Sequence, residues 1–140
     1  MRLVIVESPY AGLAPGAVAA HETYARLALA DCLARGEAPF ASHLLYTQPG
    51  VLDDLDPVER EKGIAAGLAW GARADATAVY VDLGYSGGML QGIKHALEAG
   101  RPIVLRSIGW TCSCDGCEAR SHDDPPAGVA GLEIDMRRPE

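Results

Sequence analysis

The sequence has no hydrophobic run long enough to cross a membrane. A membrane-spanning helix needs about 18 or more consecutive apolar residues, whereas the apolar run at residues 3–6 ends at Glu7. That run is also too short for the core of a signal peptide. We therefore expect a cytoplasmic protein that does not enter a membrane.

Positive charge is scarce. The 140 residues contain 12 Lys and Arg against 19 Asp and Glu, which gives a net charge of −7, and no basic cluster is present. A groove for a nucleic acid polymer depends on clustered Lys and Arg, so that class of partner is not expected. A free nucleotide remains compatible with this charge, because helix ends and backbone amides can hold a single phosphate.

Cysteine is also scarce, and three of the four cysteines lie in the segment CSCDGCEARSH. Cysteines of a cytosolic chain are more often free thiols or metal ligands than disulfides. Three thiolates and an imidazole match the ligands of a tetrahedral zinc, although Cys-x-Cys spacing is tight for one. Reduced thiols and a redox pair are the alternatives. The expected ligands of this structural zinc are Cys112, Cys114, Cys117 and His122.

Short apolar runs alternate with longer helical patterns along most of the chain. Strands are expected at residues 3–6, 40–46, 76–83 and 102–108, and helices at 17–35, 57–74 and 88–99. This order predicts an α/β fold with three layers, Rossmann-like or flavodoxin-like: a parallel sheet of four or five strands with helices on both faces. We expect one domain at residues 1–110, with a cysteine-containing extension at 111–140 that packs on it or trails from it.

Ligands of such folds bind outside the carboxyl ends of the strands. Asp82 closes a buried strand and can accept hydrogen bonds from two sugar hydroxyls, and the following turn exposes the amides that open a helix. The turn matches neither the dinucleotide fingerprint nor the P-loop. We expect Asp82 and the amides of residues 86–88 to converge on one small-molecule cavity. The expected ligand-binding residues are Ser8, Pro9, Tyr10, Ala11, Gly12, Ser86, Gly87, Gly88 and Met89.

The second strand pattern holds further polar residues near the same edge. Only one of Ser42 and His43 can face a pocket if both lie in a strand, and a lone strand histidine is more often a packed residue than a base. Asp53 and Asp54 are either acids at the pocket rim or solvated turn residues.

The segments ESPYAG, ARGEAPFASHLLYTQPGVLDD and YVDLGYSGGM resemble a small bacterial and phage domain of the nucleoside 2-deoxyribosyltransferase-like superfamily, over residues 2–108. The resemblance implies a Rossmann-like homodimer or larger homo-oligomer that cleaves or exchanges the N-glycosidic bond of nucleosides or nucleotides without a cofactor. It assigns Asp82 to sugar binding, Ser86 and Gly88 to phosphate binding, and residues 8–12 to a loop over base and sugar.

The nucleophilic glutamate of that superfamily has no counterpart here. Its position falls on Leu90, Gln91 or Gly92, and none of these can act as a carboxylate nucleophile. An acid from elsewhere, Glu7 or Asp82, is then the catalytic candidate. Two alternatives follow from the missing glutamate and from the cysteine segment: a non-catalytic nucleotide-binding or sensor module, and a zinc-binding accessory protein.

Overall fold

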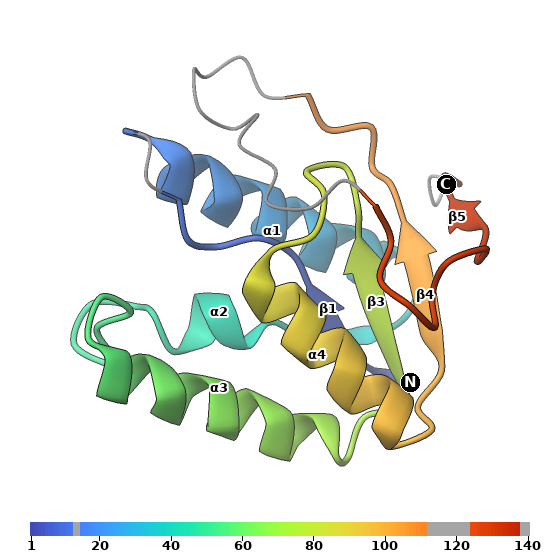
Figure 1. The fold of residues 1–140 in the computed structure, drawn as a ribbon. Coiled ribbons are helices and arrows are strands. Elements are labelled where there is room, and N and C mark those ends of the chain that lie inside the picture. Colours follow the sequence, from blue (N-terminus) through green and yellow to red (C-terminus); the bar gives the residue numbers. More distant parts are fainter. Residues whose placement is uncertain (13–14, 112–123, 138–140) are drawn as a thin grey trace.

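A computed structural model of the chain describes residues 1–12, 15–111 and 124–137. Five parallel strands form one sheet in the order β2-β1-β3-β4-β5, with helices on both of its faces (Figure 1). This confirms the predicted fold class, and the strand order is the flavodoxin-like one. The elements are β1 (Leu3–Glu7), α1 (Ala17–Ala34), β2 (Ala38–Phe40), α2 (Ser42–Leu45), α3 (Pro57–Gly71), β3 (Ala76–Tyr80), α4 (Gly87–Glu98), β4 (Ile103–Arg106) and β5 (Ile134–Asp135).

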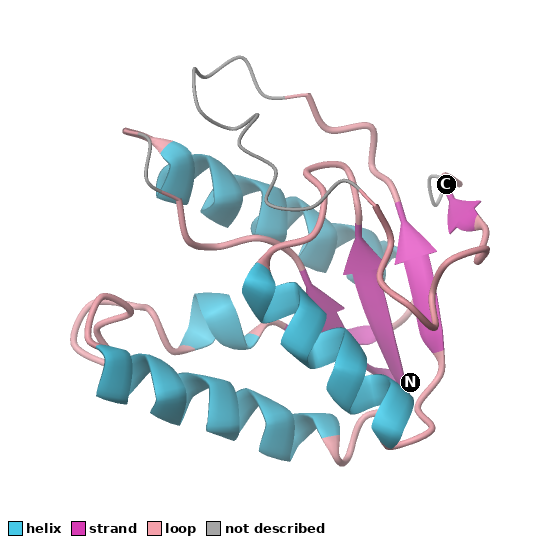
Figure 2. Cartoon of the chain, in the orientation of Figure 1, coloured by secondary structure: helices cyan, strands magenta, loops and turns pink. Residues whose placement is uncertain are grey.

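The two faces of β1 meet different helices, because successive strand side chains point to opposite sides. Val4 and Val6 are each 1% exposed and belong to the core formed with α1, which includes Tyr24. Ile5 and Glu7 therefore point to the other face, where α4 lies in front of the sheet in Figure 2. This alternation decides that the carboxylate ending β1 faces α4.

The first predicted helix is confirmed almost to the residue. It spans Ala17–Ala34, and its buried side chains form a single stripe. Gly36 follows with φ 77°, a left-handed conformation that only glycine adopts at no steric cost. The start of α3 is also confirmed, since the Asp56 side chain accepts hydrogen bonds from the amides of Val58 and Glu59.

The predicted strand at residues 40–46 is wrong. Strand β2 ends at Phe40, and the chain then forms the one-turn helix α2 over Ser42–Leu45. A short apolar run does not distinguish a strand from a helical turn, and here tertiary packing selects the turn. The rings of Tyr46 and Trp70 pack against Phe40, with centroids 6.2 and 5.3 Å away.

The C-terminal part adds a strand that the sequence pattern did not indicate. Residues Ile134 and Asp135 pair with β4, and Val129 is fully buried in the core on the α4 side of the sheet. The described part of the extension thus joins the same sheet. No helix among the described residues is both long and apolar enough to span a bilayer.

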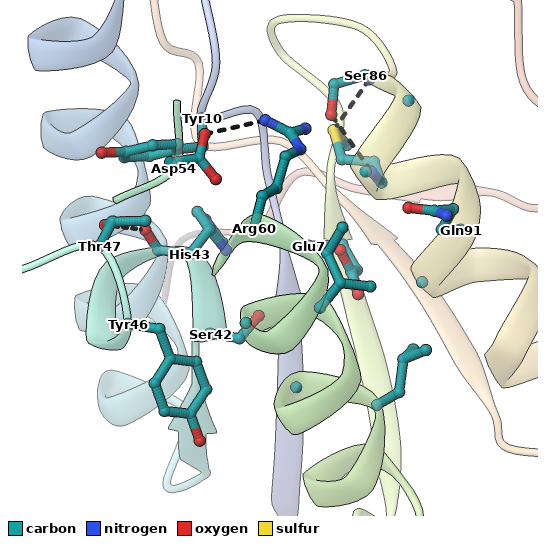
Figure 3. Close-up of a pocket in the computed structure, with 18 of the residues that line it drawn as sticks. Glu7, Tyr10, Ser42, His43, Tyr46, Thr47, Asp54, Arg60, Ser86 and Gln91 are labelled. Atoms are coloured by element: carbon teal, nitrogen blue, oxygen red, sulfur yellow. Dashed lines mark hydrogen bonds and ion pairs between the residues drawn. The ribbon is translucent and has the colours of Figure 1, made fainter. Parts of the chain in front are cut away.

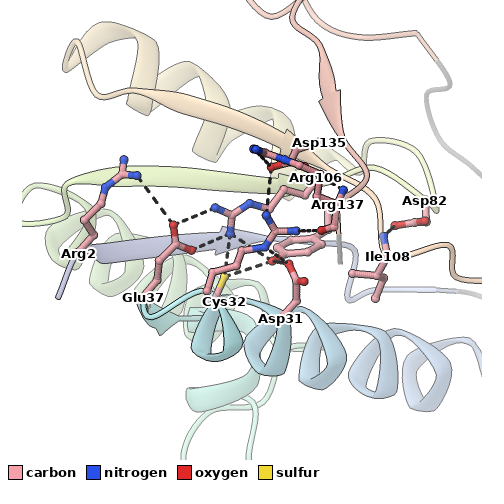
Figure 4. A network of polar contacts seen from close by, with 11 residues as sticks. Arg2, Asp31, Cys32, Glu37, Asp82, Arg106, Ile108, Asp135 and Arg137 are labelled. Atoms are coloured by element: carbon pink, nitrogen blue, oxygen red, sulfur yellow. Dashed lines mark hydrogen bonds and ion pairs between the residues drawn. The ribbon is translucent and has the colours of Figure 1, made fainter. Parts of the chain in front are cut away.

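A buried ion pair links β4 to the α1–β2 connection (Figure 4). The Arg106 guanidinium donates two hydrogen bonds to the Glu37 carboxylate, at 2.7 and 2.9 Å, and both side chains are buried. The pairing holds the pKa of Glu37 below its ordinary value, against the effect of desolvation. This pair lies on the α1 side of the sheet, away from the cavity described next.

Candidate functional site

A cavity of about 290 Å³ opens on the α4 side of the sheet. Its walls come from β1, the loop after it, α2, α3 and the first turns of α4 (Figure 3). We call it the Glu7 cavity. It lies where the strand order reverses between β1 and β3, which is the ligand-binding position of open parallel sheets. The volume is near the lower end of the range for small-molecule sites.

Most of the predicted ligand-binding residues line this cavity. They are Ser8, Tyr10, Ala11, Ser86, Gly87, Gly88 and Met89. The catalytic candidate Glu7 lines it as well. Pro9 and Gly12 are not among the lining residues. A Cβ on Gly12 would lie 2.5 Å from that of Ala17, so this glycine allows the loop to approach α1 closely.

Glu7 places a carboxylate in the cavity. Within the described residues it has no hydrogen bond and no ion pair. Desolvation raises the pKa of Glu7 from 4.5 to about 8, and the Arg101 guanidinium partly opposes this shift. A carboxyl group with this pKa exchanges a proton near neutral pH, which suits a group that takes part in chemistry.

Gly92 on α4 makes room for that carboxylate. A Cβ at this position would lie 1.9 Å from Glu7 Oε1, so any other residue would displace the Glu7 side chain. Leu90, Gln91 and Gly92 are the three positions to which the resemblance assigns the missing glutamate. The Cα–Cβ direction at Gly92 points at the carboxylate of Glu7, which belongs to β1.

Ser8 and His43 form a polar pair in the cavity wall. Ser8 Oγ and His43 Nε2 are 2.7 Å apart, and burial lowers the pKa of His43 to about 4. The imidazole is therefore neutral at physiological pH. Both Ser42 and His43 line the cavity, because α2 is a helical turn and not a strand. The expectation that only one of the two faces the pocket is wrong for this reason.

The cavity also has a cationic wall on α3. Arg60 forms an ion pair with Asp54 at 2.9 Å, and its guanidinium projects toward the start of α4, where Ser86 lies (Figure 3). Ser86 Oγ caps α4 by accepting from the Met89 amide. A Cβ on Gly87 or Gly88 would meet nothing within 4 Å, so a ligand can approach the backbone there.

Asp82 does not line the cavity, which corrects the expected convergence with the α4 amides. Its carboxylate accepts four hydrogen bonds from within the chain, two from hydroxyls and two from backbone amides, at 2.6 to 3.1 Å. The donors are Tyr24, Ser107, Ile108 and Trp110. Although desolvation raises it, these donors together lower the pKa of Asp82. Asp82 anchors the loop after β4, as its contact with Ile108 in Figure 4 shows.

The predicted zinc ligands Cys112, Cys114, Cys117 and His122 lie outside the described residues. Among the residues that the structure does describe, no cluster of three or more His, Cys, Asp or Glu side chains is arranged to hold a metal.

Several cavity residues carried no signal in the sequence. Arg60, Arg101 and His95 belong to helical or loop segments whose charges are typical of a solvated surface. The burial of His95 Nδ1, which has no hydrogen-bond partner among the described residues, follows only from the packing of α4. For Gln91 the resemblance gave a weak indication, and it does line the cavity.

One solved structure with a similar fold is a 2-deoxyribosyltransferase from the psychrotolerant bacterium Bacillus psychrosaccharolyticus, studied as a biocatalyst for nucleoside synthesis. The two chains are 19% identical, with a TM-score of 0.53, and the similarity covers 79% of this chain and 77% of that one. No curated protein matches the sequence. At this identity the likeness establishes the fold alone.

A family model matches the part of the chain that contains most of the sheet and all residues lining the Glu7 cavity. Residues 2–106 match the model of DUF7768, a domain of unknown function, and the chain is therefore a member of that family.

Proposed function

We propose that the protein cleaves or exchanges the N-glycosidic bond of a nucleoside or nucleotide, with Glu7 as its catalytic carboxylate. The observation that carries this proposal is the Glu7 carboxylate lying in the space beside Gly92. A deoxyribosyltransferase shares the fold, and the position of that superfamily's glutamate falls on Leu90, Gln91 or Gly92 of this chain. The same reactive group then enters the cavity from β1 instead of α4.

The reaction starts with ionised Glu7. One carboxylate oxygen attacks the anomeric carbon, the carbon–nitrogen bond breaks, and its electron pair leaves with the base, which takes up a proton. The enzyme then carries a glycosyl ester on Glu7. Attack by water on the anomeric carbon yields the free sugar, whereas attack by a second base yields a new nucleoside, and both restore the carboxylate.

The walls of the cavity suit such a substrate. Apolar side chains of Ile5, Leu52 and Ile64 offer a surface for a base, and the Ser8–His43 pair offers polar atoms near Glu7. The start of α4 and the Arg60 guanidinium lie where a phosphate group of a nucleotide would be neutralised.

A non-catalytic nucleotide-binding module is the second candidate. The observation in its favour is the raised pKa of Glu7, about 8, which leaves the carboxyl group mostly protonated at neutral pH. A neutral carboxyl group binds a ligand as a donor and an acceptor but does not attack an anomeric carbon.

Incubation with a panel of nucleosides and deoxynucleotides, each with and without an acceptor base, tests the proposal. Chromatography is expected to detect free base or an exchanged nucleoside with the wild type and none with Glu7→Gln. A ligand-induced rise in melting temperature without any released base, at pH 7 and at pH 9, would refute catalysis and support the binding module.

A further inference from the structure

Arg101 lines the same cavity as Glu7. Arg101 Nε donates to Thr77 Oγ1 at 2.9 Å. Thr77 is fully buried on β3 and pairs in register with Ile5, two residues before Glu7. Paired residues of parallel strands share a face, so the Thr77 hydroxyl that holds the Arg101 guanidinium lies on the Glu7 face of the sheet. Thr77 is level with Ile5, about two residue rises, roughly 7 Å, before Glu7 along the strand direction.

A second contact fixes the guanidinium in place. Arg101 Nη1 donates to the Gly71 carbonyl at the end of α3, at 2.6 Å. A Cβ on Gly71 would lie 3.3 Å from Nη2, so the guanidinium rests against the backbone of that glycine. One hydrogen bond to the sheet and one to α3 hold the cation at a set position without direct contact with Glu7.

The other ionisable groups of the cavity do not supply a free positive charge to Glu7. Burial keeps His43 neutral, and Arg60 is paired with Asp54. Glu59 is engaged by the backbone amide of Asp53. Within the described chain, Arg101 is the cavity cation that has no carboxylate in ion-pair contact. The remaining titratable side chains lining the cavity are Tyr10, Tyr46 and His95.

From this geometry we infer that Arg101 is a positioning residue that keeps Glu7 available as an anion for attack on the substrate. Burial alone drives the carboxyl group toward its protonated form, and a guanidinium held in the same cavity favours the charged form. The pKa of Glu7 shows both influences, with desolvation the larger and Arg101 opposing it. The inference rests on the proposed function of Glu7 and adds the residue that sets its working pH.

The test titrates Glu7 directly in the full chain, by the carbon-13 resonance of its carboxyl group, identified by its loss in Glu7→Gln. Arg101→Met removes the charge and Arg101→Lys retains it. Arg73→Met is the matched control, because Arg73 is an exposed arginine outside the cavity. We expect a midpoint near pH 8 in the wild type and the Arg73 variant, higher by roughly one pH unit or more in Arg101→Met, and near that of the wild type in Arg101→Lys.

An unchanged midpoint in Arg101→Met would overturn the inference. If that variant does not fold, Arg101→Gln takes its place, since its amide can still donate to the Gly71 carbonyl without carrying charge. The titration needs no turnover, so it decides the role of Arg101 even if no substrate is cleaved. If the protein releases base, the rising limb of kcat/KM against pH must shift in Arg101→Met by the same amount as the midpoint. A limb that stays in place would refute the role of Arg101 and leave the proposed function of Glu7 standing.

Discussion

Glu7 ends β1 and Asp82 follows β3, two neighbouring central strands, and the structure gives the two acids opposite surroundings. The Asp82 carboxylate accepts four hydrogen bonds, its pKa is lowered, and it does not line the cavity. Glu7 faces the cavity without a hydrogen-bond donor among the described residues, and its pKa is raised to about 8. The number of donors around each carboxylate, and not its place at a strand end, separates the lowered pKa of Asp82 from the raised pKa of Glu7.

The largest effect is expected from removing the Glu7 charge. Glu7→Gln keeps the shape of the side chain but cannot form a glycosyl ester, so we expect kcat/KM to fall by about 10³-fold or more. Steady-state kinetics with chromatographic detection of base measures this. Retained activity in Glu7→Gln would show that the contrast between the two acids has no catalytic meaning.

Gly92→Ala is expected to have the next largest effect. The new Cβ would lie 1.9 Å from Glu7 Oε1 and displace it. A shift of about 1 Å at a reacting group costs roughly 10²-fold in rate, and the far-UV circular dichroism should stay that of the wild type.

The double variant Glu7→Ala, Gly92→Glu sharpens this test, because it removes the carboxylate of β1 and supplies one to the cavity from α4. Activity above that of Glu7→Ala alone is expected. Equal activities would argue that the space beside Gly92 is not where the carboxylate works.

Asp82→Asn should weaken the fold and not the chemistry. Each oxygen of the Asp82 carboxylate accepts two hydrogen bonds, and in the asparagine variant an NH2 group takes the place of one oxygen. Two donors then lose their acceptor, which we expect to lower the free energy of unfolding by about 2–4 kcal/mol. Urea unfolding measures the loss, with Glu61→Gln on the exposed face of α3 as the control. A stable Asp82→Asn protein that has lost activity would instead place Asp82 in the reaction.

The smallest effect concerns stability against pH. The pKa of Glu7 is about 8 in the folded chain and 4.5 ordinarily, so its contribution to stability is present below pH 4.5 and is lost as the pH rises through 8. Glu7→Gln should therefore gain about 1–2 kcal/mol relative to the wild type between pH 5 and pH 8.5, less than the full shift implies because the cavity opens to solvent. Melting curves at the two pH values report the gain, and parallel changes in both proteins would contradict a raised pKa.

Local patterns were enough to predict the elements with a strong signal. The breaker-free Ala- and Leu-rich stretch predicted α1, and Asp56 before Pro57 predicted the start of α3. The run after Phe40 was misread as a strand, since a few apolar residues fit either structure. Strand β5 has two residues and carries no pattern of its own.

The site was predictable only in part. The loop after β1 and the turn before α4 lie at the binding edge in any fold of this class, and so Ser8 and Gly88 were found. Arg101 was not, because its contacts to Thr77 and Gly71 join segments 24 and 30 residues away in the chain.

The sequence by itself determined the alternation of strands and helices, and with it a parallel sheet whose carboxyl edge is the expected position of a ligand site. Only the tertiary structure decided that Glu7, and not Asp82, lines the cavity. Side chains of a strand alternate between its two faces, and this alternation directs Glu7 toward α4, where Gly92 leaves room for it. The loop after β4 brings its amides to Asp82. Local backbone preference sets the order of strands and helices. The surroundings of Glu7 and Asp82 depend on hydrogen-bond donors and space supplied by segments distant in the chain, which no local pattern records.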